Sequence, residues 1–465
     1  MDLNYFLADT HAHLEHDDFA ADVEAVVSRA RAAAVRYIVV PACAAADAPR
    51  ALELARRLDG VYFAAGLHPN CGLRLDEREA AGIRKALQQG KAEGLAVAVG
   101  ECGLDYHYLA LPRAEQLELL RWHLALAREL ELPIILHQRE AEEDMRRALD
   151  EAGVPPRGGV LHCFSAGRDY YEWARGRGLR VSFTGNLTFD AKARKRRGVF
   201  ADLELATTML ETDAPYMTPA PHRGKRNEPA YLPLVAEALS ARAGAGLQDV
   251  YAETTLAARR FFGLPPDFGG AIAYRLRNSL YLNVTNRCPN ECRFCIRERA
   301  PGVGGHDLRL HMEPSAAEVL AAIGDPAAYD EVVFCGYGEP TLRWEVVKEV
   351  ARAVKKAGGA VRLNTNGSAN LTQGRDVTAE MAGVFDKVSV SVNAPDAADY
   401  ERLCRPAFGP RTWPALEEFV AGAKGSVGTV VVTAVAAPGV DATAVENLAH
   451  RWGVGFRLRR YAAGG

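Results

Sequence analysis

Short apolar runs alternate with longer amphipathic segments, and this alternation restricts the fold more than any other feature of the chain. Eight runs precede residue 266: Tyr5–Ala8, Tyr37–Ala42, Val61–Gly66, Leu95–Gly100, Pro133–Leu136, Gly159–Leu161, Arg180–Thr184 and Thr208–Leu210. They are too short for helices and too continuous for half-exposed strands, as expected of buried parallel strands. Segments such as Arg113–Leu132 and Pro229–Ala243 have apolar residues at helical spacing between them. Eight strand–helix repeats within about 265 residues predict a closed eight-stranded TIM-type α/β barrel.

The same alternation restarts in the second part of the chain. Prolines and paired glycines in Gly263–Ala271 end the last helix of the first part and indicate a linker over residues 266–277. Six further runs follow: Leu280–Val284, Glu331–Phe334, Val361–Asn364, Lys387–Val392, Gly428–Val435 and Phe456–Arg459. They predict a six-stranded, partial (β/α) barrel. Because 465 residues exceed what one core usually holds, we expect two domains, residues 1–265 and 278–465.

Composition restricts the compartment and the partners. The net charge of −3 does not indicate a nucleic-acid-binding protein, so such a role requires a local basic patch. Nine cysteines, three of them clustered, argue against a disulfide framework and indicate a reducing cytoplasm. The first residues do not form an export signal, and no run of 18 or more apolar residues occurs. We therefore expect a cytoplasmic protein without a membrane span; nothing in the sequence indicates its oligomeric state.

Six potential metal ligands stand at the C-terminal ends of apolar runs in the first part, where barrel active sites form. They are His11, His13, Glu101, His137, His162 and Asp213. His11 and His13 are two residues apart in an extended segment and therefore point to the same side. This set exceeds what one ion needs and suits two ions bridged by a carboxylate such as Glu101. Ions about 4 Å apart activate water and stabilise the leaving oxygen of a phosphodiester, and mixed nitrogen and oxygen donors suit zinc, manganese or magnesium.

The motifs around these residues resemble those of the TatD family of metal-dependent deoxyribonucleases, which are amidohydrolase-like barrels. The shared motifs are Asp9–His13, Gly66–Pro69, Gly100–Asp105, Leu136–Glu140, His162–Ser165, Glu211–Tyr216 and His222–Pro229. The resemblance covers residues 5–265 and implies hydrolysis of phosphodiesters from the 3′ end of DNA. It further implies that Glu101 and Asp213 are catalytic and that Glu101 bridges the two ions. One ion would be held by His11, His13 and Asp213, and the second would be completed by His137 and His162.

A phosphate substrate also requires nearby cations, and Arg223, Lys225 and Arg226 follow the last ligand run. We expect these three residues to bind DNA or a nucleotide. His68 in Gly66–Pro69 is either structural support or a further substrate contact. Two other readings of the barrel stay open. It could be a metal-containing module that binds a nucleic acid or nucleotide for the second domain, or a hydrolase of amides or esters.

The segment Cys288–Cys295 carries a different metal chemistry. Three thiols spaced C-x3-C-x2-C can bind three irons of a four-iron four-sulfur cluster and leave the fourth iron free for a ligand. A structural zinc site would need a fourth cysteine or histidine. His306 and His311 are the nearby candidates, and residues 297–305 contain no second pair of ligands. The spacing therefore favours an iron–sulfur cluster over zinc.

Residues 278–461 resemble the radical SAM superfamily through the cysteine motif, Phe334–Thr341, Asn364–Gly367 and Ser389–Asn393. The resemblance implies that Cys288, Cys292 and Cys295 bind the cluster, which needs an external electron donor. The residues implied to contact S-adenosylmethionine are Phe294 near the adenine, Gly336, Gly338, Glu339 and Pro340 at the methionyl ammonium, and Ser391 and Asn393 at the ribose or carboxylate. Tyr337 departs from the usual pair of adjacent glycines. The whole chain resembles TatD-linked radical SAM proteins, with a radical substrate that the sequence does not identify.

Overall fold

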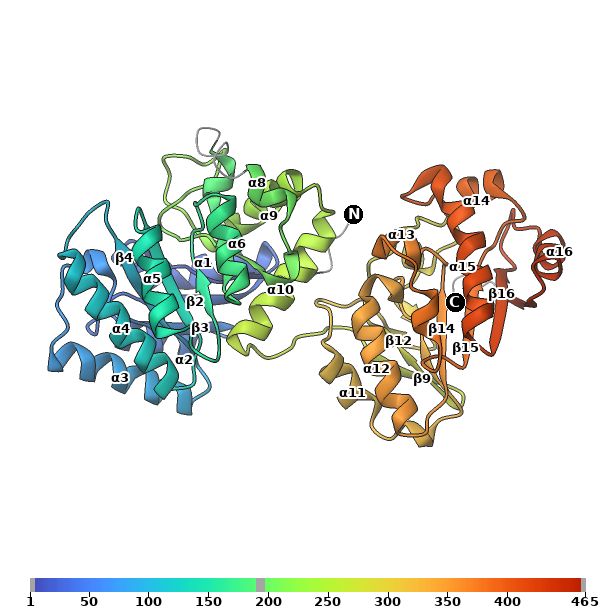
Figure 1. Cartoon of the computed structure of the whole chain (residues 1–465), viewed down its shortest axis with the longest axis horizontal. Coiled ribbons are helices and arrows are strands. Elements are labelled where there is room, and N and C mark those ends of the chain that lie inside the picture. Colours follow the sequence, from blue (N-terminus) through green and yellow to red (C-terminus); the bar gives the residue numbers. More distant parts are fainter. Residues whose placement is uncertain (1–4, 190–196, 461–465) are drawn as a thin grey trace. The chain divides into compact units, whose positions relative to one another are not determined.

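The computed structural model describes residues 5–189 and 197–460 and divides into two compact units (Figure 1). The division falls between Pro266 and Asp267. In Figure 1 the first unit is coloured from blue to yellow-green and the second from yellow to red. Within the described ranges, every helix is too short or too polar to traverse a lipid bilayer.

The first unit is a closed barrel of eight parallel strands in chain order, which confirms the predicted fold. Its strands are β1 Leu7–Asp9, β2 Val35–Ala42, β3 Val61–Ala65, β4 Ala96–Asp105, β5 Ile134–Arg139, β6 Gly159–Leu161, β7 Arg180–Phe183 and β8 Thr208–Leu210. The barrel closes because β1 pairs with β2 on one side and with β8 on the other. All residues of β4 are buried, as expected for a parallel strand covered on both faces.

Helices cover the outside of the barrel. They are α1 Val23–Ala32, α2 Ala48–Arg57, α3 Glu77–Ala92, α4 Arg113–Glu129, α5 Glu142–Ala152, α6 Arg168–Gly176, α8 Arg197–Ala201, α9 Leu232–Ala243 and α10 Leu247–Phe262. The predicted amphipathic segments correspond to α4 and α9. Helix α10 ends where Gly263 takes the left-handed conformation with φ 68° and donates its N–H to Arg259 O, the usual glycine stop signal.

The second unit is built on an open sheet whose six parallel strands confirm the prediction. They are β10 Ser279–Leu282, β13 Val332–Phe334, β14 Val361–Thr365, β15 Lys387–Ser391, β16 Thr429–Val435 and β17 Gly455–Arg459. A seventh strand, β9 Ala273–Leu276, pairs antiparallel with β10. This strand falls within residues 266–277, which the sequence suggested as a linker. It was not predicted as a strand because four residues are too few to show a clear hydrophobic period. Tyr274 of β9 is buried and packs with Leu308 and Tyr337.

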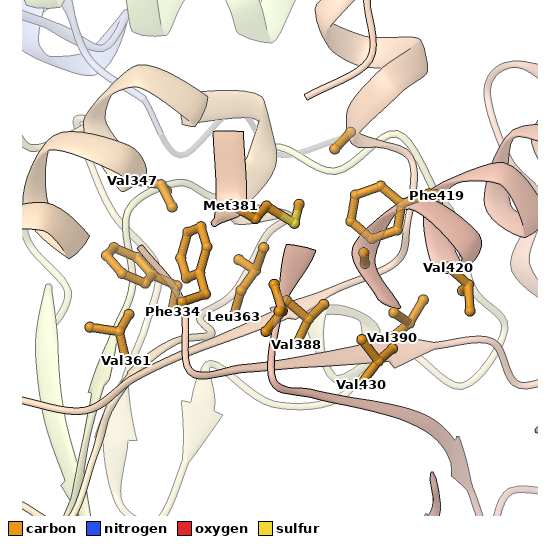
Figure 2. Packing of buried hydrophobic residues seen from close by; sticks show 14 of the residues in the cluster. Phe334, Val347, Val361, Leu363, Met381, Val388, Val390, Phe419, Val420 and Val430 are labelled. Atoms are coloured by element: carbon orange, nitrogen blue, oxygen red, sulfur yellow. The ribbon is translucent and has the colours of Figure 1, made fainter. Parts of the chain in front are cut away.

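One face of this sheet packs against helices. Figure 2 shows side chains from successive strands, among them Phe334, Leu363 and Val388, together with Phe419 and Val420 of a covering helix. The helices are α11 Ala316–Ile323, α12 Trp344–Lys356, α13 Ala369–Gln373, α14 Ala397–Cys404, α15 Thr412–Ser426 and α16 Ala442–Trp452. Because alternate residues of a strand point to opposite faces, the other face carries polar side chains, including Arg362, Asn364, Ser389, Ser391 and Arg459.

Candidate metal centre and cluster site

Glu101 on β4 lies buried at the centre of the barrel site, and its two carboxylate oxygens face two different groups of imidazoles. Oε2 is 3.0 Å from Nε2 of His11 and 3.7 Å from Nε2 of His13. Oε1 is close to the ring nitrogens of a second group, at 2.7 Å from His162 Nε2, 2.9 Å from His137 Nδ1 and 3.1 Å from His68 Nε2. The carboxylate therefore joins the two groups, as a bridging ligand would.

Asp213, which follows β8, adds a second carboxylate beside the first imidazole pair. Its Oδ1 atom is 3.6 Å from Nε2 of His13 and 3.9 Å from Nε2 of His11. The backbone N–H of Asp213 donates to His11 O at 2.8 Å, which fixes the loop after β8 against the end of β1. The barrel thus brings all six predicted ligands into one site.

The donor set fits divalent cations. Three groups have ligand atoms within 4.8 Å of one another: His11, His13 and Glu101; His11, His162 and Asp213; His68, Glu101 and His137. The Nε2 atoms of His11 and His13 lie 3.3 Å apart, and imidazole nitrogens that converge with carboxylates are ligands that zinc and manganese accept. Although burial opposes ionisation, the surrounding imidazoles of His162, His68 and His11 hold the pKa of Glu101 well below its usual range. A buried, ionised carboxylate needs positive charge beside it.

His68 lies closer to this centre than the sequence indicated. Besides its contact with Glu101, its Nδ1 atom accepts the backbone N–H of Asn70 at 3.1 Å, which turns Nε2 toward the site. Gly66 permits this approach, because a Cβ atom there would lie 2.6 Å from Glu101 O. His68 is therefore a seventh donor at the centre. Its position in a loop beyond β3, rather than at the strand end, left its orientation open in the sequence.

Three buried carboxylates that the sequence did not single out contact the far nitrogens of the ligand rings. The contacts are His137 Nε2 to Asp105 Oδ2 at 3.0 Å, His13 Nδ1 to Glu15 Oε1 at 3.2 Å and His162 Nδ1 to Glu211 Oε1 at 3.6 Å. The contacts of Asp105 and Glu15 are hydrogen bonds, and such acceptors fix the tautomer and orientation of a ligating imidazole. At 3.6 Å, Glu211 is beyond hydrogen-bond range of His162 and contributes its charge alone. Asp105 and Glu211 belong to the motifs around Glu101 and Asp213, and Glu15 stands two residues after His13, so proximity to the ligands was the available signal.

Replacing Asp105 by asparagine is expected to weaken divalent-ion binding about 10- to 100-fold. The amide could face His137 Nε2 with its N–H₂ group, which would favour the tautomer with its proton on Nδ1, the atom that faces Glu101. The dissociation constants of manganese and zinc, measured by competition with a chelating dye, check this. Asp144→Asn is the matched control, because Asp144 accepts from the Tyr106 hydroxyl and does not contact a predicted ligand. Equal affinity of Asp105→Asn and wild type would contradict the role of Asp105.

A cavity of about 660 Å³ lies over the centre and is lined by Glu101, Asp213 and four of the histidines. Among the described residues, the three predicted phosphate-binding residues do not line it. Arg226 forms a bidentate pair with Asp22 at 2.8 Å, and Arg223 donates to Thr218 O and lies 3.9 Å over the ring of Phe189. Lys225 is exposed. The two arginines thus hold the loop after β8, and the contact of all three residues with phosphate stays a prediction.

The cysteine loop of the second unit follows β10. Cys288, Cys292 and Cys295 are free thiols and half-buried. All three interact with Arg297: burial disfavours its charge, but the neighbouring thiols raise the pKa of its guanidinium above the usual value. Phe294 packs against the core cluster of this unit. Three free thiols around the half-buried guanidinium of Arg297 suit thiolate ligation of an anionic cluster.

The segment after β13 lies directly against this loop. A Cβ atom at Gly336 would lie 2.2 Å from Asn283 Oδ1, and one at Gly338 would lie 2.2 Å from Arg287 O, so both positions need glycine. Tyr337 between them packs with Tyr274, and its hydroxyl donates to Ala300 O at 3.1 Å. The tyrosine therefore fits without displacing either glycine.

Glu339 is buried, and its carboxylate accepts hydrogen bonds from the Thr341 hydroxyl at 2.7 Å, the Thr365 hydroxyl at 2.8 Å and the Asn366 N–H at 2.7 Å. Pro340 begins the short 3-10 helix that follows it, Pro340–Arg343. The carboxylate thus joins the ends of β13 and β14, a role that the motif alone did not reveal.

Ser391 and Asn393 are also engaged within the protein. Ser391 Oγ accepts from Arg459 Nη2 at 2.9 Å, and Asn393 Oδ1 accepts the N–H of Val435 at 2.9 Å. Arg459, at the end of β17, is a residue that the sequence did not indicate for this site. The contacts of Ser391 and Asn393 with S-adenosylmethionine stay a prediction.

A closed barrel with carboxylates and imidazoles gathered at its C-terminal mouth defines a metal-dependent hydrolase, and comparison with known proteins supports this class. Residues 8–263 match the family model of TatD related DNase, and the chain belongs to this family. Residues 282–451 match the radical SAM superfamily. The predicted combination of two enzyme domains is confirmed.

Relatives cover the first unit almost completely. An uncharacterized metal-dependent hydrolase of Bacillus subtilis, YabD, is 37% identical over 55% of this chain and 98% of its own length. The 3′-5′ ssDNA/RNA exonuclease TatD of Erwinia amylovora is 32% identical over 55% of this chain and 99% of its own. The crystal structure of the TatD homologue YJJV from Escherichia coli has 31% identity and a TM-score of 0.52, and it covers 57% of this chain and 100% of that one.

Proposed function

We propose that the barrel hydrolyses phosphodiester bonds at the 3′ end of DNA with the help of two divalent cations. One observation carries this proposal: each oxygen of Glu101 faces its own group of imidazoles, as close as 3.0 Å on one side and 2.7 Å on the other. His11, His13 and Asp213 would hold one ion. His137 and His162 would hold the second, with Glu101 between the two. The ions supply activation of a water molecule and stabilisation of the leaving oxygen.

Asp213 is the side chain proposed to accept a proton during this reaction. Burial opposes the charge of Asp213, but His13 and His11 lower the pKa of its carboxyl group. Asp213 is therefore ionised near neutral pH and suited to accept a proton from the attacking water. The name of the Erwinia relative supports single-stranded nucleic acid as the substrate class, and the resemblance of the motifs supports DNA.

The substrate class can be tested directly against the alternative of an amide or ester hydrolase. We expect the full chain with manganese to release nucleotides from 3′-labelled single-stranded DNA. We expect no more than background hydrolysis of p-nitrophenyl acetate and of a cyclic amide such as dihydrouracil. Release rates over a common range of substrate concentrations give the comparison. Turnover of the ester or amide without turnover of DNA would favour the alternative. DNA binding without turnover of any substrate would favour a presenting module.

For the second unit we propose a four-iron four-sulfur cluster on Cys288, Cys292 and Cys295. The residues proposed to bind S-adenosylmethionine are Phe294, Gly336, Gly338, Glu339, Pro340, Ser391 and Asn393. Cluster and cosubstrate together supply radical chemistry once an electron donor reduces the cluster. The protein contributes the fixed arrangement of the β10, β13 and β14 ends described above. The match of residues 282–451 supports this proposal, and the radical substrate is left unassigned.

A further inference from the structure

Two exposed tyrosines line the cavity of the first unit. Tyr108 is 63% exposed and Tyr216 is 53% exposed, and they are the exposed large aromatic side chains among the described residues. Keeping large rings in water at the mouth of a catalytic cavity forgoes the favourable free energy of burial. Exposed apolar surface of this kind commonly marks a binding site.

The two rings come from opposite sides of the barrel. Tyr108 follows β4 and Tyr216 follows β8, and these strands are four positions apart in either direction around the closed eight-stranded wall. The cavity that both rings line also contains Glu101 and Asp213. A ligand that crosses the cavity from one tyrosine to the other therefore passes over the metal centre.

Both loops are anchored by residues of the metal centre. The N–H of Tyr108 donates at 2.9 Å to Asp105 Oδ1, while Oδ2 of the same carboxylate faces His137. On the other side, the N–H of Tyr216 donates at 2.8 Å to Asp213 O, and its carbonyl accepts from Asn227 Nδ2 at 2.6 Å. The positions of the rings are thus tied to the ligands, and the mouth is preorganised to place a substrate relative to the ions.

A cation stands beside one of the rings. Arg139 at the end of β5 lines the cavity, and its guanidinium lies 4.7 Å over the ring of Tyr108. The other arginine that lines the cavity, Arg50, pairs with Asp17 at 2.7 Å. Within the described part of the chain, Arg139 forms no ion pair. An unpaired guanidinium next to an exposed aromatic ring suits a phosphate that is attached to a stacked base.

We propose that Tyr108 and Tyr216 are base-stacking platforms on opposite sides of the metal centre, and that Arg139 binds a backbone phosphate on the Tyr108 side. The strand then crosses the barrel mouth with one unpaired base on each side of the scissile phosphate. This inference rests on the proposed nuclease function and assigns its substrate contacts. Stacking needs a π face and no particular base, so the site takes unpaired strands with little sequence preference. Paired bases have no free face to offer.

The test couples each tyrosine to one base of the substrate. The substrates are a single-stranded hexanucleotide and two versions with an abasic residue at the last or the next-to-last position. The enzymes are wild type, Tyr108→Leu and Tyr216→Leu, and the measured quantity is kcat/KM for release of the 3′ nucleotide. Each leucine variant is expected to lose about 5- to 150-fold on the complete substrate. When the base that the replaced tyrosine would stack is also removed, kcat/KM of that variant should not fall further, because the two changes delete the same contact.

Three further variants sharpen the test. Phenylalanine at either tyrosine position keeps the ring and should keep kcat/KM within about twofold, because stacking does not need the hydroxyl. Leu109→Ala is the matched control, since Leu109 is 48% exposed beside Tyr108 but does not line the cavity. Arg139→Gln should reduce the slope of log kcat/KM against log salt by about 0.7. An unchanged slope would remove Arg139 from phosphate contact.

The outcomes separate this inference from the proposal on which it rests. A wild-type chain that releases no nucleotide overturns the nuclease proposal itself. In a second outcome, wild type releases the nucleotide normally, but the loss from each leucine variant and the loss from each abasic residue multiply. This outcome would show that the tyrosines do not stack these bases, while the nuclease proposal would remain valid. Circular dichroism verifies folding, and because both rings are exposed, we expect the leucine variants to fold as wild type does.

Discussion

Replacing Glu101 by glutamine is expected to reduce nucleotide release about 1,000-fold, equivalent to about 4 kcal/mol of transition-state stabilisation. Glutamine has the same shape but no charge. It cannot bridge two cations, because its amide offers one acceptor oxygen and one N–H₂ donor, so one of the two imidazole groups, at 3.0 Å or 2.7 Å, loses its acceptor. Single-turnover release from 3′-labelled single-stranded DNA measures the effect. We expect the circular dichroism spectrum to stay unchanged, since the side-chain volume is conserved.

Glu140→Gln is the matched control for this experiment. Glu140 follows β5 and pairs with His107 at 2.9 Å, and it does not line the cavity over the metal centre. We expect it to retain wild-type release. Should Glu101→Gln retain a tenth or more of the wild-type rate with its fold intact, Glu101 does not bridge the ions.

Replacing Cys292 by alanine is expected to remove the brown chromophore of the anaerobically purified protein and all reductive cleavage of S-adenosylmethionine. A four-iron four-sulfur cluster that has three protein thiolates cannot be held stably by two. Visible absorbance, iron content and formation of 5′-deoxyadenosine with dithionite check the prediction.

Two controls accompany this variant. Cys335→Ala removes a half-buried thiol outside the C-x3-C-x2-C motif and should keep the chromophore. Hydrolysis by the first unit should be unchanged in both variants, because each unit has its own core. A wild-type spectrum in Cys292→Ala would mean that these thiols bind something other than the cluster.

The sequence was sufficient to predict the architecture because the C-terminal ends of parallel strands lie together on one side of a barrel or sheet. In a closed parallel barrel, the C-terminal ends of all strands meet at one mouth, so His11, Glu101 and His137 after three apolar runs had to converge. The structure extends β4 to Asp105 and β5 to Arg139, beyond the predicted ends of these runs. The same reasoning applied to the parallel sheet of the second unit. It failed for β9, Ala273–Leu276, because a four-residue antiparallel edge strand has no period long enough to distinguish it from a linker.

Contacts between residues far apart in sequence were beyond such reasoning. Arg226 stands in a motif that suggests phosphate contact, yet its guanidinium pairs with Asp22, more than 200 positions earlier, and the sequence contains no sign of that pairing. Similarly, the carboxylate of Asp105 serves both His137 and the loop of Tyr108. Only the closed barrel shows that one side chain connects a metal ligand with the rim of the cavity.

Nucleotide release after removal and return of the divalent cations tests whether the site around Glu101 is a metal-dependent nuclease. The anaerobically purified chain is stripped of divalent cations with a chelator and titrated with manganese, with 3′-labelled single-stranded DNA as substrate. We expect no release from the stripped protein and full recovery as two ions bind per chain. Release that persists without ions, or no release with two ions bound, would contradict this expectation.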